Sequence, residues 1–268
     1  MLDLTFLIPT QIETEDRLRN IISSVSYLLK HVPAKVIVKE VSNRPTFQFR
    51  AIPEIRKCVD TYNLTYLYEE SSESWFCKSK VLNDLIVASN TKVVANYDVD
   101  AILPVQSYFD AYKLIDENHA DVVYPYQCGV YQWKVEYNSD IYNEFILNLD
   151  TRILDKNKTL YNYTIGWSQF INRQVYIDSF MMNENFISWG CEDDEFYYRM
   201  SVLGNRIARI DNYIYHLEHS RTPNSWFSNP NFNNNYQLWN QIKTFDKNQL
   251  MQYYENLKYL KKRRQELV

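Results

Sequence analysis

Short apolar runs alternate with segments of helical periodicity in the first part of the chain, and this alternation constrains the fold more than any other feature. The runs that predict buried strands are residues 4–9, 36–38, 64–68 and 92–97. The segments that predict helices between them are residues 15–30, 53–62 and 78–89. Strands joined by helices build a largely parallel sheet with helices on both faces. We therefore expect an α/β fold that binds its ligands at the carboxyl ends of the strands.

The second half of the chain is less regular, and residues 127–160 fit neither pattern. The elements expected there are helices at residues 110–118, 192–203 and 249–267, strands at residues 122–124, 207–210 and 213–216, and a loop at residues 221–235. Gly204 is placed to end the second of these helices. No repeat or linker divides the chain, so the sequence predicts one domain over residues 1–268.

Composition excludes several other classes of protein. Lys plus Arg is 29 and Asp plus Glu is 33, so the net charge is −4 and no basic surface for nucleic acid is expected. The four cysteines have no Cys-x-x-Cys spacing, which argues against a zinc ribbon or redox motif. No apolar run approaches the ~20 residues that span a bilayer, and the start is unlike a signal peptide, so we expect a cytoplasmic protein. The basic run 261–264 predicts a solvated helix face or, alternatively, a weak peripheral membrane contact.

Asp98-Val99-Asp100 follows a predicted strand and is the first candidate site. Two carboxylates at a strand end can share a divalent ion with a diphosphate, because Mn²⁺ and Mg²⁺ prefer oxygen ligands. A solvated turn is the alternative, since the pattern Asp-x-Asp is common.

His216-Leu217-Glu218-His219 is the second candidate site. The chain has only 4 histidines, and two of them stand three residues apart just after a predicted strand. A set of carboxylate and imidazole ligands suits Mn²⁺. Two histidines with packing or surface roles are the alternative.

The third candidate is the segment Trp189-Gly190-Cys191-Glu192-Asp193-Asp194-Glu195. Four consecutive acids repel one another, and the helix dipole explains part of the clustering at the start of a predicted helix. It does not explain the preceding Trp-Gly, which suits a tight turn beside a flat ligand. A carboxylate at this place could act as a general base toward a hydroxyl group.

Together these segments resemble the β-1,4-galactosyltransferase family and the related bacterial chondroitin-polymerase-type transferases, which have the GT-A fold. The segment 189–194 resembles the family motif Trp-Gly-Gly-Glu-Asp-Asp, and Phe76-Cys77-Lys78 resembles the start of a helix that reaches the nucleotide. The resemblance covers residues 4–221. It implies a nucleotide-sugar-binding half (residues 1–125), an acceptor and metal half (126–235) and a helical tail (236–268).

The resemblance also implies roles for individual residues. Asp100 and His219 would bind the metal, His216 could be a further ligand, and Asp98 would reach ribose or the metal through water. The residues implied at the donor are Pro9, Thr10, Glu40, Phe76, Lys78, Asp98, Val99, Trp189 and Gly190. Asp193 would be the general base, and Glu192 and Asp194 would bind sugar hydroxyls beside it. The residues implied at the acceptor are Gly166, Trp167, Trp189, Glu192 and Asp194.

Three departures from the family pattern bear on the substrates. Cys191 replaces the second Gly and would narrow the pocket floor. Trp167 follows Gly166 where the family has a second Gly, so its indole would fill space or stack on a sugar. Lys78 replaces an Arg and loses its bidentate geometry. Residues 221–235 are expected to form a lid over the donor or, alternatively, an ordinary surface loop.

The implied reaction is an inverting transfer of galactose or an N-acetylhexosamine from a UDP-sugar, with Mn²⁺ or Mg²⁺, to a hydroxyl of an oligosaccharide, polysaccharide or glycolipid. Two alternatives come from other classes of protein. One is a non-catalytic carbohydrate-binding protein on a transferase scaffold. The other is a sugar nucleotidyltransferase, although the Gly-rich phosphate loop of that class is not found after the first predicted strand.

Overall fold

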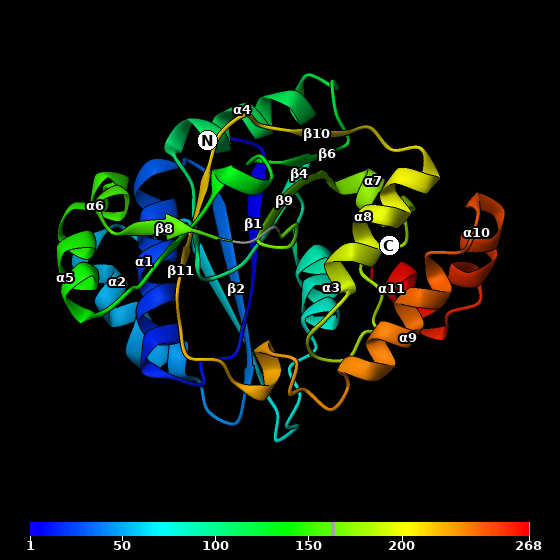
Figure 1. The fold of residues 1–268 in the computed structure, drawn as a ribbon, viewed down its shortest axis with the longest axis horizontal. Coiled ribbons are helices and arrows are strands. Elements are labelled where there is room, and N and C mark those ends of the chain that lie inside the picture. The colour runs from blue at the N-terminus through cyan, green and yellow to red at the C-terminus, as the bar shows by residue number, and fades with distance from the viewer. Residues whose placement is uncertain (162–163, 268) are drawn as a thin grey trace.

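A seven-stranded sheet forms the centre of the computed structural model, which describes residues 1–161 and 164–267 (Figure 1). Its strands are β1 (Leu4–Thr10), β2 (Lys35–Ser42), β3 (Leu64–Glu70), β4 (Val93–Tyr97), β6 (Val122–Tyr124), β9 (Ser168–Asn172) and β10 (Ile207–Arg209). Their order is β10-β6-β9-β4-β1-β2-β3. All neighbours are parallel except β9, which runs antiparallel to β4 and β6. The predicted α/β fold with a mostly parallel sheet is confirmed.

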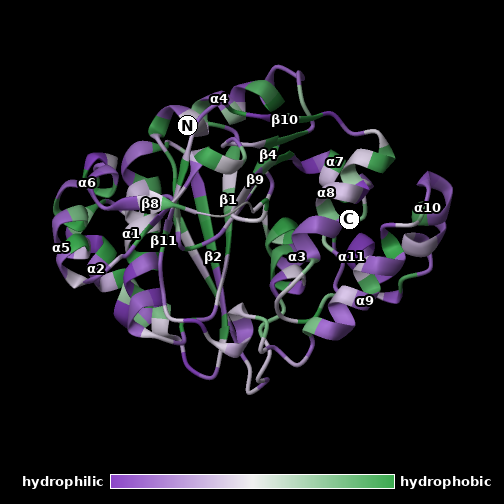
Figure 2. Cartoon of the chain, in the orientation of Figure 1, coloured by the Kyte–Doolittle hydropathy of each residue, from purple (hydrophilic) through white to green (hydrophobic). Residues whose placement is uncertain are grey.

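Helices cover both faces of this sheet, because its central strands are apolar on both sides. Every residue of β1 and β4 is buried, as expected for strands between two helical layers. Figure 1 shows α1 (Glu15–His31) and α2 (Ile52–Cys58) on one side and α3 (Lys78–Ala88) and α8 (Glu192–Leu203) on the other. Two further helices, α4 (Val105–Asp116) and α7 (Arg173–Asp178), also pack against the sheet. Figure 2 shows that the surrounding helices mix hydrophobic and hydrophilic residues, which is typical of helices with one buried face.

A second sheet of four strands stands beside the first, in the order β5-β11-β7-β8. Its strands are β5 (Ala101–Ile102), β11 (Ile214–Leu217), β7 (Gln132–Val135) and β8 (Lys158–Leu160), and α5 (Ser139–Asn148) and α6 (Thr151–Lys156) connect the last two. β5 follows directly after β4 and the Asp98–Asp100 turn. The antiparallel pairing of β5 with β11 therefore brings His216 beside Ala101, next to that turn.

Three helices close the chain: α9 (Phe232–Ile242), α10 (Lys247–Glu255) and α11 (Lys258–Glu266). They pack against α8 and α3. Arg263 of α11 is buried and pairs with Asp84 at 2.5 Å and with Glu184 at 2.7 Å. One cation of the predicted basic run thus stabilises the fold instead of facing solvent. Among the described residues, no helix is both long and apolar enough to cross a membrane.

Most predicted elements of the first half are found to within a few residues, whereas three predicted segments differ from the structure. The expected helix 53–62 ends at Cys58, after a π-helical turn at Phe47–Ala51. The expected loop 221–235 contains a 3₁₀ turn (Pro223–Ser225), and its last residues already belong to α9. The expected helix 249–267 is two helices, because the chain leaves the helical conformation between Glu255 and Lys258.

Candidate active site

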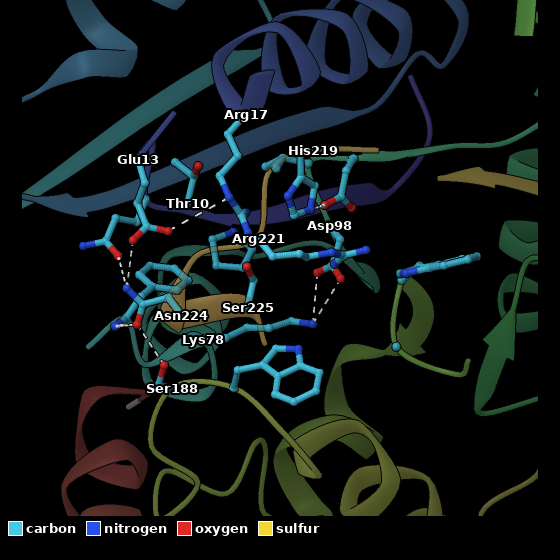
Figure 3. A pocket seen from close by; sticks show the side chains of 18 of the residues that line it. Thr10, Glu13, Arg17, Lys78, Asp98, Ser188, His219, Arg221, Asn224 and Ser225 are labelled. Atoms are coloured by element: carbon cyan, nitrogen blue, oxygen red, sulfur yellow. Dashed lines mark hydrogen bonds and ion pairs between the residues drawn. The ribbon is translucent and has the colours of Figure 1, made fainter. Parts of the chain in front are cut away.

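A cavity of about 190 Å³ opens where β1 and β4 end, as the sheet topology predicts (Figure 3). Residues from segments far apart in the sequence line it: the end of β1 with the residues that follow, the start of α3, the turn after β4, the residues 164–167 before β9, and the start of α8 with the segment before it. β11 and the residues that follow it complete the wall. All three motifs of the sequence thus meet at this one cavity.

Asp100, His216 and His219 form a cluster at one end of the cavity, the metal end. One ligand atom from each lies within 4.8 Å of the others. Asp100 Oδ2 is 3.0 Å from His219 Nε2 and 3.6 Å from His216 Nε2. The cluster is assembled by backbone pairing, because Leu217 N donates a hydrogen bond to Asp100 O at 2.7 Å.

The outer nitrogens of both imidazoles are already engaged. His219 Nδ1 lies 2.9 Å from Ser220 O, a carbonyl oxygen that can only accept, so Nδ1 carries the hydrogen. His216 Nδ1 is 2.9 Å from Glu218 Oε1. Such outer partners are typical of metal-binding histidines, since they aim the Nε2 lone pair at the ion.

The metal end has room for a positive charge between its ligand atoms. Two Nε2 lone pairs beside the Asp100 carboxylate repel it unless a proton or a metal cation lies between them. Asp100 Oδ1 is buried and has no hydrogen-bond partner among the described residues. Burial alone would lower the pKa of His216, but the carboxylates of Asp100 and Glu218 raise it to about 9. These residues therefore fit a divalent cation, which would replace the proton.

Lys78, Asp98 and Asp193 form a second charged group in the cavity wall, which we call the base end. Lys78 Nζ is 3.0 Å from Asp98 Oδ1 and 3.4 Å from Asp193 Oδ2. Burial would lower the pKa of Lys78, but the carboxylates of Asp193 and Asp98 raise it well above its usual range. Lys78 is thus a permanent cation that connects the turn after β4 with the start of α8, and Figure 3 shows it reaching Asp98.

Glu192 is buried behind Asp193 and faces the backbone of the preceding turn. Its Oε2 accepts a hydrogen bond from Gly190 N at 2.9 Å. Burial, together with the charge of Asp193, raises the pKa of Glu192 to about 7. Glu192 therefore holds a proton more readily than an ordinary carboxyl group.

The backbone before α8 is shaped to place Asp193. A Cβ at Gly166 would lie 2.2 Å from Asp193 Oδ2, so only glycine leaves room for this carboxylate. Gly190 has φ +113° and packs under the ring of Phe232. Cys191 also has a positive φ, 69°, where the resembling motif has glycine. Cys191 does not line the cavity, and burial raises the pKa of its thiol to about 12, so it is neutral.

Trp167 borders the cavity but is only 7% exposed. Its ring stacks on His216, with the ring centroids 5.0 Å apart and the planes at 26°, and it also contacts Tyr161 and Tyr126. Of the two expectations for this indole, the packing role is the one that these contacts support.

The predicted lid segment lines the cavity through Asn224 and Ser225, and hydrogen bonds tie it to three other segments of the wall. Asn224 Nδ2 donates hydrogen bonds to Gln11 Oε1 and Glu13 Oε1, while Asn224 Oδ1 accepts from Phe76 N and Ser188 Oγ. Figure 3 shows Asn224 between Glu13 and Ser188. This segment thus connects the end of β1, the start of α3 and the turn before Trp189.

Most residues expected at the site line the cavity, but three do not. Those that do are Pro9, Thr10, Phe76, Lys78, Asp98, Val99, Asp100, Gly166, Trp167, Trp189, Glu192, Asp193, His216 and His219. Glu40 is placed elsewhere: it is buried, and its carboxylate accepts hydrogen bonds from Thr46 N, Phe47 N and Tyr66 Oη. Asp194 is exposed and outside the cavity, and Gly190 is covered by Phe232.

Several polar residues of the cavity were not expected from the sequence: Gln11, Glu13, Arg17, Thr164 and Ser188. Arg221, Asn224 and Ser225, which also line it, belong to the expected lid segment. Arg17 comes from the first turn of α1, and its Nε is buried without a hydrogen-bond partner among the described residues. Arg221 lies 3.6 Å from Glu218. A helix periodicity could not reveal Arg17, because only the packing of α1 against the segment after His219 turns it toward the cavity.

Comparison with known proteins identifies this architecture. Residues 176–220, which include the acidic motif and both metal-end histidines, match the family model described as N-terminal domain of galactosyltransferase. Among proteins with curated descriptions, none matches the sequence.

Solved structures share the fold. S. aureus TarS 1-349 in complex with UDP-GlcNAc aligns with a TM-score of 0.61 and 15% identity over 100% of this chain and 70% of that chain. GalNAc-T7 with UDP, GalNAc and Mn²⁺ aligns with a TM-score of 0.58 and 13% identity over 85% of this chain and 45% of that chain. The Pyrobaculum calidifontis mannosyltransferase PcManGT with GDP-Man and Mn²⁺ aligns with a TM-score of 0.52 and 13% identity over 81% of this chain and 56% of that chain. This chain spans only 60% of the TarS 1-349 structure without ligand. The predicted GT-A glycosyltransferase fold and the likeness to galactosyltransferases are confirmed.

Proposed function

We propose that this GT-A-fold chain with a galactosyltransferase-type segment is a metal-dependent, inverting glycosyltransferase. It would move galactose or an N-acetylhexosamine from a UDP-sugar to a hydroxyl group of a carbohydrate. The observation that carries the proposal is that Asp193 and the Asp100/His216/His219 cluster line one and the same cavity.

Asp100, His216 and His219 would hold the divalent cation, for which Mn²⁺ suits the mixed oxygen and nitrogen ligands. A bound cation supplies Lewis-acid stabilisation of the negative charge that grows on the leaving UDP. The Mn²⁺ in the GalNAc-T7 and PcManGT structures supports this choice.

The end of β1 and the turn after β4 would hold the nucleotide. Pro9 and Thr10 line the cavity at the end of β1, and Asp98 and Val99 line it at the turn after β4. The UDP and UDP-GlcNAc in structures of TarS, which shares this fold, support a uridine nucleotide as the ligand.

Asp193 would act as the general base. Its carboxylate would accept the proton of the acceptor hydroxyl while that oxygen attacks the anomeric carbon and the bond from this carbon to the UDP oxygen breaks. Lys78 Nζ lies 3.4 Å from Asp193 Oδ2 and helps to fix the position of this carboxylate. Inversion is the outcome of the proposed single displacement, in which the acceptor oxygen attacks the face of the anomeric carbon opposite the UDP oxygen.

UDP release from a panel of UDP-sugars, with Mn²⁺, Mg²⁺ or chelator and with or without sugar acceptors, tests the proposal. We expect metal-dependent release with one donor. Asp193→Asn should reduce transfer by about 10²–10⁴-fold and leave binding of UDP and Mn²⁺ nearly unchanged, as expected for loss of a general base. Asp194→Asn is the matched control, because this neighbouring carboxylate is exposed and outside the cavity. Normal transfer by Asp193→Asn would refute the assignment.

A further inference from the structure

A row of aromatic rings leads from the cavity wall out along α9, and we call it the aromatic strip (Trp189, Trp226, Phe227, Phe232 and Tyr236). Trp189 lines the cavity. Its ring stacks on Phe232 at a centroid distance of 5.6 Å and meets Phe227 edge-on at 4.9 Å. Phe232 in turn stacks on Tyr236 at 6.1 Å, with only 18° between the planes. The rings therefore form a continuous path from the base end of the cavity to the surface.

The outer members of the strip are exposed to solvent. Phe227 is 60% exposed, Tyr236 50% and Trp226 44%. Burial of large aromatic side chains is favourable, so their exposure to solvent costs free energy. A contiguous group of exposed aromatic side chains therefore marks a binding surface.

The polar residues between these rings show what kind of partner the strip suits. From Thr222 to Ile242 the chain has no charged side chain. The guanidinium of Arg221 lies 5.4 Å from the centroid of the Trp226 ring, but this charge is already paired with Glu218 at 3.6 Å. The exposed positions beside the rings include Ser228, Asn233, Asn234 and Gln237. Amide and hydroxyl groups bind hydroxyl groups, whereas an anionic or cationic partner would be matched by opposite charges. Apolar ring faces combined with neutral hydrogen-bonding groups are complementary to the two kinds of surface on a sugar ring.

The strip is held in place before any ligand binds. The side chain of Asn235 accepts a hydrogen bond from Ile187 N and donates to Ile187 O and Trp189 O, which fastens α9 to the segment that carries Trp189. A preformed surface loses little conformational entropy when it binds a ligand.

We propose that the aromatic strip binds an extended neutral glycan and directs its terminal hydroxyl to Asp193. This inference rests on the proposed function and narrows it: the acceptor is an uncharged chain of several sugar units, and a single sugar binds much more weakly. Continuity of the strip with the cavity favours this occupant over a second copy of the chain, whose contact with these rings would cover the entrance.

Binding of neutral hexasaccharides tests the inference, with chitohexaose, cellohexaose, maltohexaose and mannohexaose as probes beside their monosaccharides and a heparin hexasaccharide. We expect at least one neutral hexasaccharide to bind ~10-fold or more tightly than its monosaccharide, by calorimetry in the presence of UDP and Mn²⁺. The double variant Phe227→Ala/Tyr236→Ala should lose this binding at least 10-fold and keep the wild-type melting temperature, since both side chains are largely exposed. Tyr62→Ala is the matched control, an 89% exposed aromatic outside the strip.

The other outcomes overturn the inference. No binding of any neutral hexasaccharide, preference for the heparin fragment, unchanged affinity in the double variant, or a dimer that the double variant dissociates would each refute it. Binding of UDP and Mn²⁺ in the same experiments separates the two proposals: if it is retained, only the acceptor surface is wrong, and if it is absent from the wild type, the proposed function fails first.

Discussion

The two ends of the cavity neutralise their carboxylates in different ways. At the metal end, Asp100 faces two imidazoles whose Nδ1 atoms are bound elsewhere, so a proton or a metal ion must supply the positive charge. At the base end, Lys78 is itself the cation between Asp98 and Asp193. The first arrangement suits an exchangeable ion, and in the second the positive charge belongs to a side chain of the protein itself.

The backbones of the two ends also differ. The metal end stands on paired strands, which fix Asp100 and His216 by ordinary ladder hydrogen bonds. The base end follows a segment in which Phe180, Met181 and Ser188 all have positive φ, as does Cys191. Such residues need tertiary contacts to hold them.

A buried ion pair supplies part of this support. Arg199 and Glu195 of α8 are both fully buried, 2.8 Å apart, and the guanidinium of Arg199 also donates to the carbonyl groups of Ser179 and Met181. Tyr254 of α10 donates to the carboxylate of Glu195. The C-terminal helices thus help to position the base, although they lie outside the cavity.

We expect the largest effect from a substitution that removes a metal ligand and leaves the base end unchanged. His219→Ala removes one of three clustered ligands, so we expect affinity for Mn²⁺ to fall more than ~10²-fold and transfer at limiting metal to fall with it. Binding of Mn²⁺ by electron paramagnetic resonance, without nucleotide, measures this directly. His119→Ala, at an exposed histidine outside the cavity, is the matched control. Wild-type Mn²⁺ affinity in His219→Ala would mean that the cluster holds no metal.

We expect the next largest effect from a substitution that displaces the proposed base, Asp193, and does not change the metal ligands. Gly166→Ala puts a Cβ where Asp193 Oδ2 lies, so the carboxylate must move, and displacement of a catalytic group by ~1 Å can cost ~10²-fold in rate. We expect transfer to fall ~10–100-fold while Mn²⁺ affinity stays the same. Gly204→Ala is the control for a general loss of stability, because its Cβ meets no atom within 4 Å and its cost comes from the positive φ. Equal losses of activity in both variants would contradict the positional explanation.

The same difference between the two ends decides how much of the fold the sequence could predict. β1, β4 and α3 are predictable because apolar strands and amphipathic helices repeat with regular periods, and the helix Glu192–Leu203 because Gly204 ends it. The second sheet was missed since β5 has two residues and β8 is partly exposed, which leaves no period to read.

The site was predictable where it depends on motifs and not where it depends on packing. Asp100, His216, His219 and Asp193 stand in short patterns, and the topology brings these patterns together. Glu40 was misassigned because its position at a strand end is equally suited to a ligand and to a buried carboxylate that caps the turn at Thr46 and Phe47.

A third test concerns pH and the excess negative charge of the base end. The pKa of Glu192 is about 7 in the folded protein and 4.5 in a solvated chain, so the folded state binds more protons between these values and wild-type stability falls as pH rises through this range. Glu192→Gln cannot ionise and keeps an acceptor for Gly190 N. We expect its free energy of unfolding to exceed that of the wild type by up to ~3.5 kcal/mol at pH 8, since each pKa unit between 4.5 and 7 corresponds to ~1.4 kcal/mol, and this difference should vanish below pH 4.5.

Urea denaturation across pH measures this difference for Glu192→Gln. Glu144→Gln, at an exposed position of α5, is the matched control and should run parallel to the wild type. If the free energy of unfolding of Glu192→Gln also varied with pH in parallel with that of the wild type, Lys78 would already neutralise the whole base end.

The smallest expected effect asks whether the backbone strain at the base end is needed. Cys191 has φ 69°, a conformation that costs a non-glycine residue ~1 kcal/mol, whereas glycine adopts it freely but gains entropy in the unfolded chain. These two effects nearly offset, so we expect Cys191→Gly to change the free energy of unfolding by less than ~1 kcal/mol, in the stabilising direction, with transfer unchanged. Cys128→Gly, at φ −81°, relieves no strain and should lose ~0.5–1 kcal/mol. Equal losses in the two variants would show that Cys191 contributes packing that a glycine cannot replace, and that the base end depends on this side chain as well as on its backbone.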